Sequence, residues 1–141
     1  MTKDELLRLP DMAASIANEG KRIEAMRARL YSPKGLDTRD KVQSSGGNNM
    51  LAETVIDLQN KLNARIEKYE QLRAEAYVMI ERTLTGDMYY VMSLRYVDAL
   101  SWAEVASIVN VSAATVYRKH RAALSKLFNQ EVSYECKQVG V

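Results

Sequence analysis

The chain has 141 residues, and its 20 lysines and arginines against 18 acids give a net charge of only +2. A single cysteine excludes an internal disulfide, and with one histidine there are almost no ligands for a metal or cofactor site. No apolar run approaches the roughly 20 residues of a membrane span, and no signal peptide opens the chain. We therefore expect a cytoplasmic protein that has no membrane partner.

Helical patterns dominate the chain and strand patterns are nearly absent, which predicts an all-α fold. Thr2 and Glu5 have the spacing of a capping box at a helix start. Pro10 is expected to kink or restart this helix, and Gly20 weakens it. Its apolar residues recur at steps of three and four, with Glu19 in the one polar slot, and they are Leu9, Met12, Ile16, Ile23, Met26 and Leu30.

The segment 32–48 is rich in glycine, serine and asparagine and is longer than most connections between helices. Its three cations are suited to phosphate contacts, but two aspartates offset most of that charge. We therefore predict a mobile loop over residues 32–48.

A second helix is expected to start at Asn48 or Asn49 and to end near Thr85 and Gly86, because glycine suits a helix C-terminus. Its heptad seam runs through Leu51, Val55, Leu58, Leu62, Arg65, Tyr69, Leu72, Ala76 and Met79. Two seams in one chain predict a long antiparallel coiled-coil hairpin over residues 1–85. The alternative is that each seam packs on another subunit to form a homodimer, and both arrangements can hold together.

Residues 86–130 have the pattern of a helix-turn-helix domain, and residues 131–141 are predicted to be a disordered tail. Asp87 is expected to cap a helix that runs to about Tyr96. The next two helices are predicted from Ser101 with its capping partner Glu104, from Asn110 at the turn, and from Ser112 at the second start. The predicted core contains Trp102, the small Ala106, which lets the two helices approach, and Val116, which fills the space between them.

The second helix of this motif, residues 112–128, is the predicted recognition helix. No acid occurs from Val105 to Gln130, whereas four cations do. At about 100° per residue, Val116, Ala123 and Leu127 form a buried stripe and His120 points inward with them. The candidate DNA-binding residues are Ser112, Ala114, Thr115, Tyr117, Arg118, Lys119, Arg121, Ser125 and Lys126.

These side chains suit different parts of double-stranded DNA. Arg118 has the fork geometry that reads guanine in the major groove, and Ala114 and Thr115 suit thymine methyl groups. Arg121, Lys119 and Lys126, together with the hydroxyl of Tyr117, are assigned to phosphates. Because no acid or nucleophile lies near His120 in the sequence, we expect no enzymatic activity.

The stretch from Leu94 to Leu127, LRYVDALSWAEVASIVNVSAATVYRKHRAALSKL, resembles the fourth region of bacterial primary sigma factors. Ala113, Ala114 and Thr115 replace charged residues that are usual on the reading face of that region. A closer likeness, from Asp40 to Leu127, is to phage and prophage regulators of the ArpU and RinA type. It rests on the Lys-Val-Gln-Ser-Ser stretch, Leu-Arg-Tyr and Ser-Trp. This resemblance implies a late-gene activator in a bacterial host cell, with host RNA polymerase as a possible partner.

The residues leave two other functions open. A phage DNA-packaging recognition subunit, similar to a small terminase, also joins a helix-turn-helix to oligomerising helices. A polymerase-binding adaptor would use the sigma-like domain without contacting DNA. A subunit ring would favour packaging, whereas a monomer or dimer would favour regulation.

Overall fold

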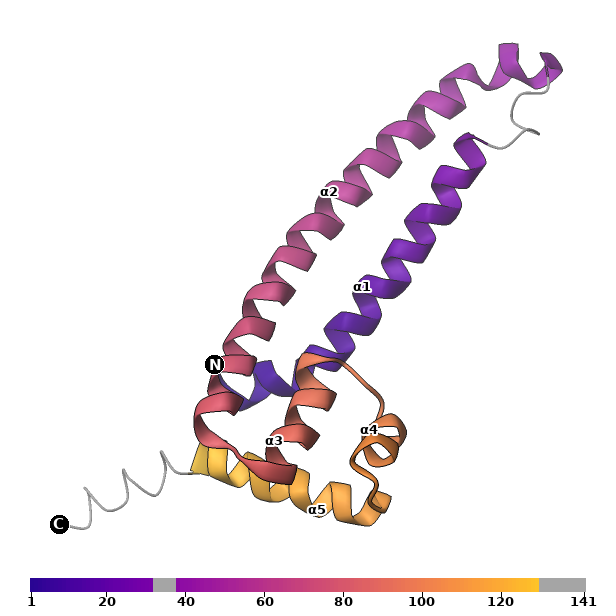
Figure 1. The fold of residues 1–141 in the computed structure, drawn as a ribbon. Helices are drawn as coiled ribbons and strands as arrows, with labels where there is room; N and C mark the ends of the chain where they lie inside the picture. Colours follow the sequence, from indigo (N-terminus) through magenta and orange to yellow (C-terminus); the bar gives the residue numbers. More distant parts are fainter. Residues whose placement is uncertain (32–37, 130–141) are drawn as a thin grey trace. The chain divides into compact units, whose positions relative to one another are not determined.

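The computed structural model describes residues 1–31 and 38–129, with side chains described for 1–31 and 49–128. These residues are almost entirely helical and include no strand, which confirms the predicted all-α class (Figure 1). In chain order the elements are α1 (Lys3–Leu30), α2 (Thr38–Thr83), α3 (Gly86–Met92), η2 (Ser93–Val97), α4 (Trp102–Val109), α5 (Ala113–Leu124) and η3 (Ser125–Asn129), of which η2 and η3 are π-helical.

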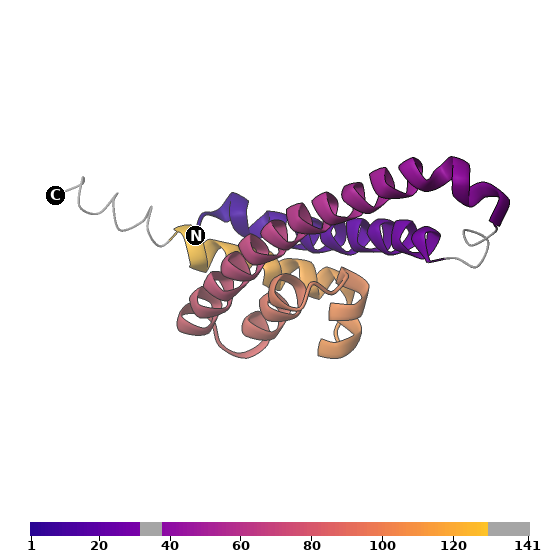
Figure 2. The same cartoon turned by 90° about the horizontal axis from the view of Figure 1, so that it is seen from above.

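The chain forms two compact units, and each is described by itself below. The first, here the helix-turn-helix unit, contains Met1–Ala13 and the chain from Tyr69 onward; the second, the helical pair, is Ala14–Lys68. In the helical pair, α1 and α2 run side by side in opposite directions (Figures 1 and 2). The units do not divide at residues 85 and 86, where the predicted domains met, because both long helices contribute residues to each unit.

The start of α1 is fixed by the predicted capping box. The Glu5 amide donates to Thr2 Oγ1 at 3.2 Å, and the Thr2 amide donates to Glu5 Oε1 at 2.9 Å. Pro10 lies inside the continuous helix. Proline removes one backbone donor, and the fully buried neighbours Leu6 and Leu9 hold the surrounding turns in place. Of the two outcomes expected at Pro10, a restart of the helix is therefore excluded.

The start of α2 differs from the predicted one, whereas its end lies close to the predicted one. The helix begins at Thr38, so residues 38–48 are helical and the predicted loop is wrong there; residues 32–37 lie outside the described residues. Two glycines at about 1 kcal/mol each are tolerated because a long helix gains one hydrogen bond per added residue. The helix ends at Thr83, and Gly86 takes the left-handed φ of 62° that only glycine adopts freely.

The next helix is also divided differently from the prediction. Thr85 is the residue before α3 and caps it without a side-chain hydrogen bond, so the predicted cap at Asp87 is wrong and Asp87 lies in the first turn. The single helix expected to reach Tyr96 becomes α3 followed by η2. The bond from the Asp98 amide to the Ser93 carbonyl, at 3.0 Å, spans five residues and defines the π-turn.

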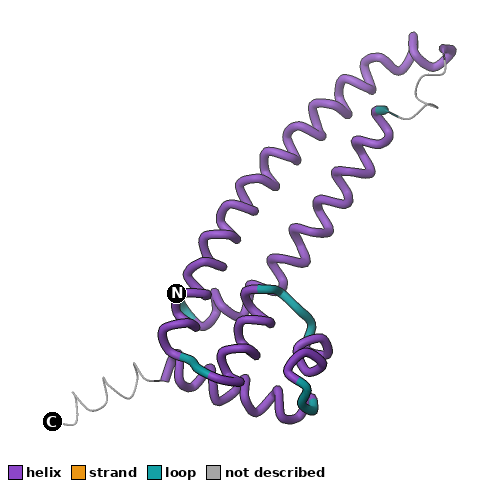
Figure 3. Tube along the Cα trace, in the orientation of Figure 1, coloured by secondary structure: helices purple, strands orange, loops and turns teal. Residues whose placement is uncertain are grey.

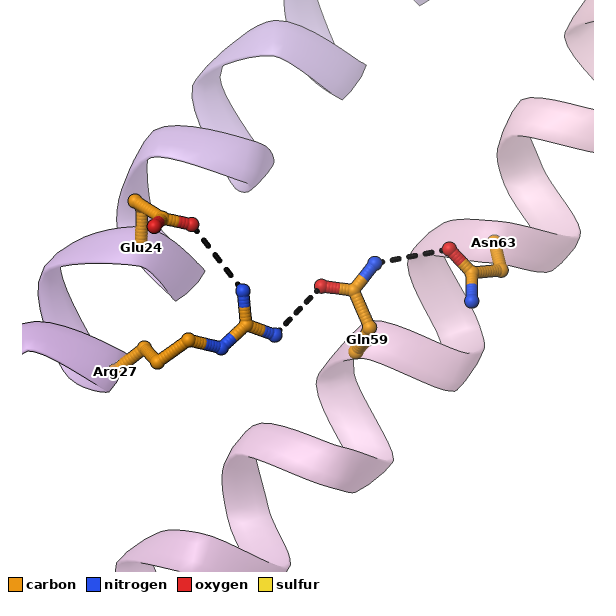
Figure 4. Close-up of polar contacts among 4 residues, drawn as sticks. All are labelled: Glu24, Arg27, Gln59 and Asn63. Atoms are coloured by element: carbon orange, nitrogen blue, oxygen red, sulfur yellow. Dashed lines mark hydrogen bonds and ion pairs between the residues drawn. The ribbon is translucent and has the colours of Figure 1, made fainter. Parts of the chain in front are cut away.

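The helical pair has a small core that follows the predicted seams. Ile23, Val55 and Leu62 are buried, and Ile16, Met26, Leu30, Leu58 and Ile66 pack partly buried around them. Arg65, which occupies a seam position, is exposed and donates to Ser15 Oγ. A polar chain also crosses between the helices (Figure 4). Arg27 bonds Glu24 on its own helix and Gln59 on α2, both at 3.2 Å, and Gln59 donates to Asn63 at 2.9 Å.

The helix-turn-helix itself is built from short-range caps, with brief loops between its helices (Figure 3). Ser101 and Glu104 form both halves of the predicted capping box at the start of α4. Asn110 then turns the chain in the left-handed region, with φ 62° and ψ 47°. The Ser112 hydroxyl accepts from the Thr115 amide at 3.2 Å and begins α5. These three predictions are confirmed.

The core of this motif brings α3, α4 and α5 together. Val91, Val105 and Val116 are 0–2% exposed, and the residues packed against them are Leu94, Leu100, Trp102, Ala106, Val109 and Val111. The core roles predicted for Trp102, Ala106 and Val116 are confirmed. This packing fixes α5 so that one of its faces is buried and the opposite face is available for a ligand.

Candidate nucleic-acid interface

Burial divides α5 and the η3 turn that continues it into the two faces that the helical wheel predicts. The buried side chains are Val116, His120, Ala123 and Leu127. The exposed side chains on the other side are Ala114, Tyr117, Arg118, Arg121, Ser125 and Lys126, whereas Thr115 and Lys119 are half-buried on the flank. Ser112, the cap, is also exposed. The structure therefore brings the nine candidate residues onto the outer side and the flank of α5, its cap and η3.

Hydrogen bonds order the first turns of this face. The hydroxyls of Ser112 and Thr115 lie 2.9 Å apart, and Arg118 Nη2 donates to Thr115 Oγ1 at 3.3 Å. Thr115 thus links the helix cap to the guanidinium that the sequence assigns to base reading. A bond to a fixed hydroxyl reduces the rotamer freedom of Arg118, so less entropy is lost when it binds a base.

The face is less purely basic than the sequence of α5 indicates. Asp87, from the first turn of α3, lies 3.0 Å from the Lys119 ammonium through its Oδ2 atom. These residues are far apart in the sequence, and no helical periodicity relates them, so sequence reasoning missed the pair. No acid occurs from Val105 to Gln130 in the sequence, but α3 places the Asp87 carboxylate beside this helix in the folded chain.

A shallow groove follows the flank of α5 where it meets the start of α3. Its lining residues are Met88, Thr115, Arg118, Lys119 and Ala122. Two of these residues are cations, and both belong to the predicted site. Met88 was not predicted, because its role depends on how α3 packs on α5.

His120 lies behind the exposed face and supports it from the core. Its Nε2 is 2.6 Å from the Tyr96 hydroxyl, and its ring packs against Trp102 with centroids 4.6 Å apart. Burial, with smaller contributions from Arg95 and Lys3, lowers the pKa of His120 below its ordinary value. Burial raises the pKa of Tyr96 to about 12. The side chain of His120 is only 9% exposed, which confirms its predicted inward position.

Arg95, in η2, contacts the aromatic cluster of Tyr96, Trp102 and His120 through its guanidinium. Its guanidinium carbon lies 4.7 Å from the centroid of the Trp102 ring, and its Nη1 donates to the Leu100 carbonyl at 2.9 Å. The cation therefore holds the start of α4 against the core and does not extend the basic face of α5. Its role is structural, and only the folded chain reveals it.

The fold and this exposed face define a helix-turn-helix protein. A comparison with protein-family profiles matches residues 20–133 to the description "ECF sigma factor". The match covers more than half of the chain, so the chain belongs to the ECF sigma factor family, which supports a DNA-binding function in transcription and an interaction with RNA polymerase. Searches of curated proteins and of solved structures gave no match.

None of the helices in the described parts of the chain is both long and apolar enough to cross a membrane. Within the same residues, no three histidine, cysteine or acidic side chains lie together as a set of metal ligands would.

Proposed function

We propose that this chain is a sequence-specific DNA-binding transcriptional regulator that reads the major groove with residues 112–128. The observation that carries the proposal is the exposed face of α5, where Ala114, Arg118 and Arg121 lie opposite the buried stripe. A rigid helix with cations on its free side fits the groove of B-DNA and its phosphates. We infer no enzymatic activity for this face.

Different residues of this face are proposed to contact the bases and the phosphates of DNA. Arg118, near the helix start and ordered by Thr115, is proposed to bind guanine O6 and N7. Arg121 and Lys126 are farther along the helix and are proposed to bind phosphates, as is the hydroxyl of Tyr117. Ala114 offers its methyl group to thymine.

Salt-dependent DNA binding by single variants tests this division. We expect Arg118→Ala to cost about 1–3 kcal/mol at one base pair of the preferred site and to relax the preference there. Arg121→Ala should weaken binding to all sequences alike. It should also make the slope of log K against log salt shallower by the equivalent of about one phosphate contact. Arg82→Ala, an exposed arginine on α2, is the matched control. Unchanged binding in both α5 variants would overturn the assigned site.

The family match supports the sigma-like part of the resemblance, and the finer identity remains our proposal. We infer a phage or prophage regulator of the ArpU and RinA type that activates late genes in the cytoplasm of a bacterial host. Transcription of phage late genes in a bacterial host, measured with and without the protein, tests this identity. A fall in late transcripts on adding the protein would contradict activation.

An exposed apolar patch supports a second function, contact with RNA polymerase. Ile108 and Tyr90 are 59% and 58% exposed, and they line one pocket with Leu94, Val109 and Asp87. Large apolar side chains that remain exposed together often mark protein contacts. We expect Ile108→Lys to keep DNA binding and to lose polymerase recruitment, measured by co-sedimentation with the host enzyme. Retained recruitment would contradict this surface.

Assembly through the helical pair is the last part of the proposal. Tyr31, Met50 and Ile56 are 60–78% exposed, while only three of the side chains that the structure describes in this unit are buried. Tyr31 and Ile56 line the same pocket, and a homodimer would cover it. Sedimentation equilibrium should give two copies, and Ile56→Glu should give one. A ring of many copies would instead favour the packaging subunit, and a monomeric wild type would exclude the dimer.

A further inference from the structure

One ion pair joins the candidate DNA-binding face to a neighbouring helix. Four other ion pairs of the described side chains each lie within a single helix, at a spacing of three or four residues. The pair of Asp87 and Lys119 instead connects α3 to α5, at 3.0 Å. It is therefore a contact between two helices, unlike the other four pairs, which lie along the surface of one helix.

The position of Lys119 places it between two possible partners. Its side chain is 31% exposed, it lines the groove with Arg118 and Thr115, and its ammonium reaches back to Asp87. A DNA phosphate at this groove would have to take the ammonium from the aspartate. The carboxylate that is left unpaired would then repel the phosphate, so its presence opposes DNA binding.

We propose that Asp87 is a specificity-determining residue, because it competes with DNA phosphate for Lys119 and so suppresses binding to non-cognate DNA. The inference rests on the proposed DNA-binding function. On non-cognate DNA the helix makes phosphate contacts alone, and the lysine stays with Asp87. On the cognate site base contacts fix α5 in the groove, and the ammonium is then held against a phosphate that displaces the carboxylate.

This role differs from that of an ordinary acid at a helix start. An aspartate in the first turn of α3 also interacts favourably with the helix dipole, and that effect acts on stability alone. Competition for Lys119 acts on the number of phosphates bound. The two roles are therefore separated by the salt dependence of binding, which a purely structural role would not change.

The test compares Asp87→Asn with the wild type on two DNA duplexes, one of mixed sequence and one selected from a random pool by the wild-type protein. We expect Asp87→Asn to steepen the slope of log K against log salt on mixed-sequence DNA by about 0.9, equivalent to one further phosphate. Affinity for mixed DNA should rise about two- to five-fold, the size of a surface ion pair. Affinity for the selected site should rise less, so the specificity ratio falls.

Two controls isolate the part played by Lys119. Asp98→Asn removes the same charge from an exposed acid after η2 that makes no ion pair with any described side chain, and it should leave the slope unchanged. In a Lys119→Met background, Asp87→Asn should no longer increase affinity. A gain that persists without Lys119, or an unchanged slope in Asp87→Asn, overturns the inference alone. A wild type without salt-dependent DNA binding overturns the proposed function and the inference together.

Discussion

The two units of this chain are stabilised to different degrees by their cores. In the helix-turn-helix unit, Val91, Met92 and Val105 are completely buried, and Tyr96, Val116 and Ala123 are at most 2% exposed. Among the described side chains of the helical pair, only Ile23, Val55 and Leu62 are buried. The difference indicates that a larger core holds the binding surface of the first unit rigid, whereas fewer buried side chains hold the second unit together.

The largest effect is expected from matched methionine substitutions in the two units. Met92 is fully buried, so Met92→Ala should lower the free energy of unfolding by about 2–5 kcal/mol. Met26 is only partly buried in the helical pair, and Met26→Ala should cost less than half as much. Urea unfolding followed by circular dichroism measures both. Equal losses would contradict the difference between the cores.

Acid should weaken the helix-turn-helix unit through His120, the single histidine of the chain. Its pKa is lowered below 6.5 by burial, so the unfolded chain takes up the proton first. The contribution of His120 to the free energy of unfolding is therefore fully present above pH 6.5. It is lost as the pH drops towards the pKa of the folded state, by up to about 1.4 kcal/mol per pH unit.

Unfolding followed by the fluorescence of Trp102 at pH 7.5 and at pH 5.5 measures this loss. In His120→Asn the difference between the two pH values should be much smaller. The same dependence in both proteins would show that other groups cause it.

Two left-handed residues allow a smaller test of how turns stabilise the same unit. Ala99 has φ 58° without the tolerance that asparagine provides at Asn110, whose φ is 62°. Ala99→Gly should therefore raise the free energy of unfolding by about 1 kcal/mol, and Asn110→Ala should lower it by a similar amount. Thermal unfolding checks both signs. A loss of stability in Ala99→Gly would mean that its methyl group contributes packing that outweighs the backbone strain.

The smallest effect is expected in the helical pair. Arg27 is 39% exposed on its side chain and its partner Glu24 is 73% exposed. Ion pairs of this kind contribute about 0–1 kcal/mol. Arg27→Met should thus change the free energy of unfolding by no more than that, even though it removes the bond to Gln59 across the two helices. A loss as large as that of Met92→Ala would show that this polar chain, and not the small core, holds the pair together.

Local signals predicted the parts of the fold that depend on neighbouring residues. The caps at Thr2, Ser101 and Ser112, the turn at Asn110 and the inward His120 all follow from spacings of three to four residues or from helical periodicity. The start of α2 was missed because glycine and serine content indicates a loop, whereas a long helix tolerates such residues when it can extend.

Contacts between elements were beyond the reach of the same reasoning. Asp87 reaches Lys119, and Tyr96 reaches His120, only after α3 and η2 pack on α5. The nine candidate residues were placed on one side of α5 from the sequence, but the acid that accompanies them was not. Charge counted along one helix therefore overestimates how basic its face is in the folded protein.

The most direct measurement is the sequencing of genomic DNA fragments that the purified full chain retains, with the wild type and Arg118→Ala compared at the same salt concentration. If α5 reads DNA through its exposed face, the wild type enriches fragments that share a short motif, and Arg118→Ala loses the preference at one position of that motif. Retention of fragments without any shared motif, or an identical motif in the variant, would contradict base reading by this helix.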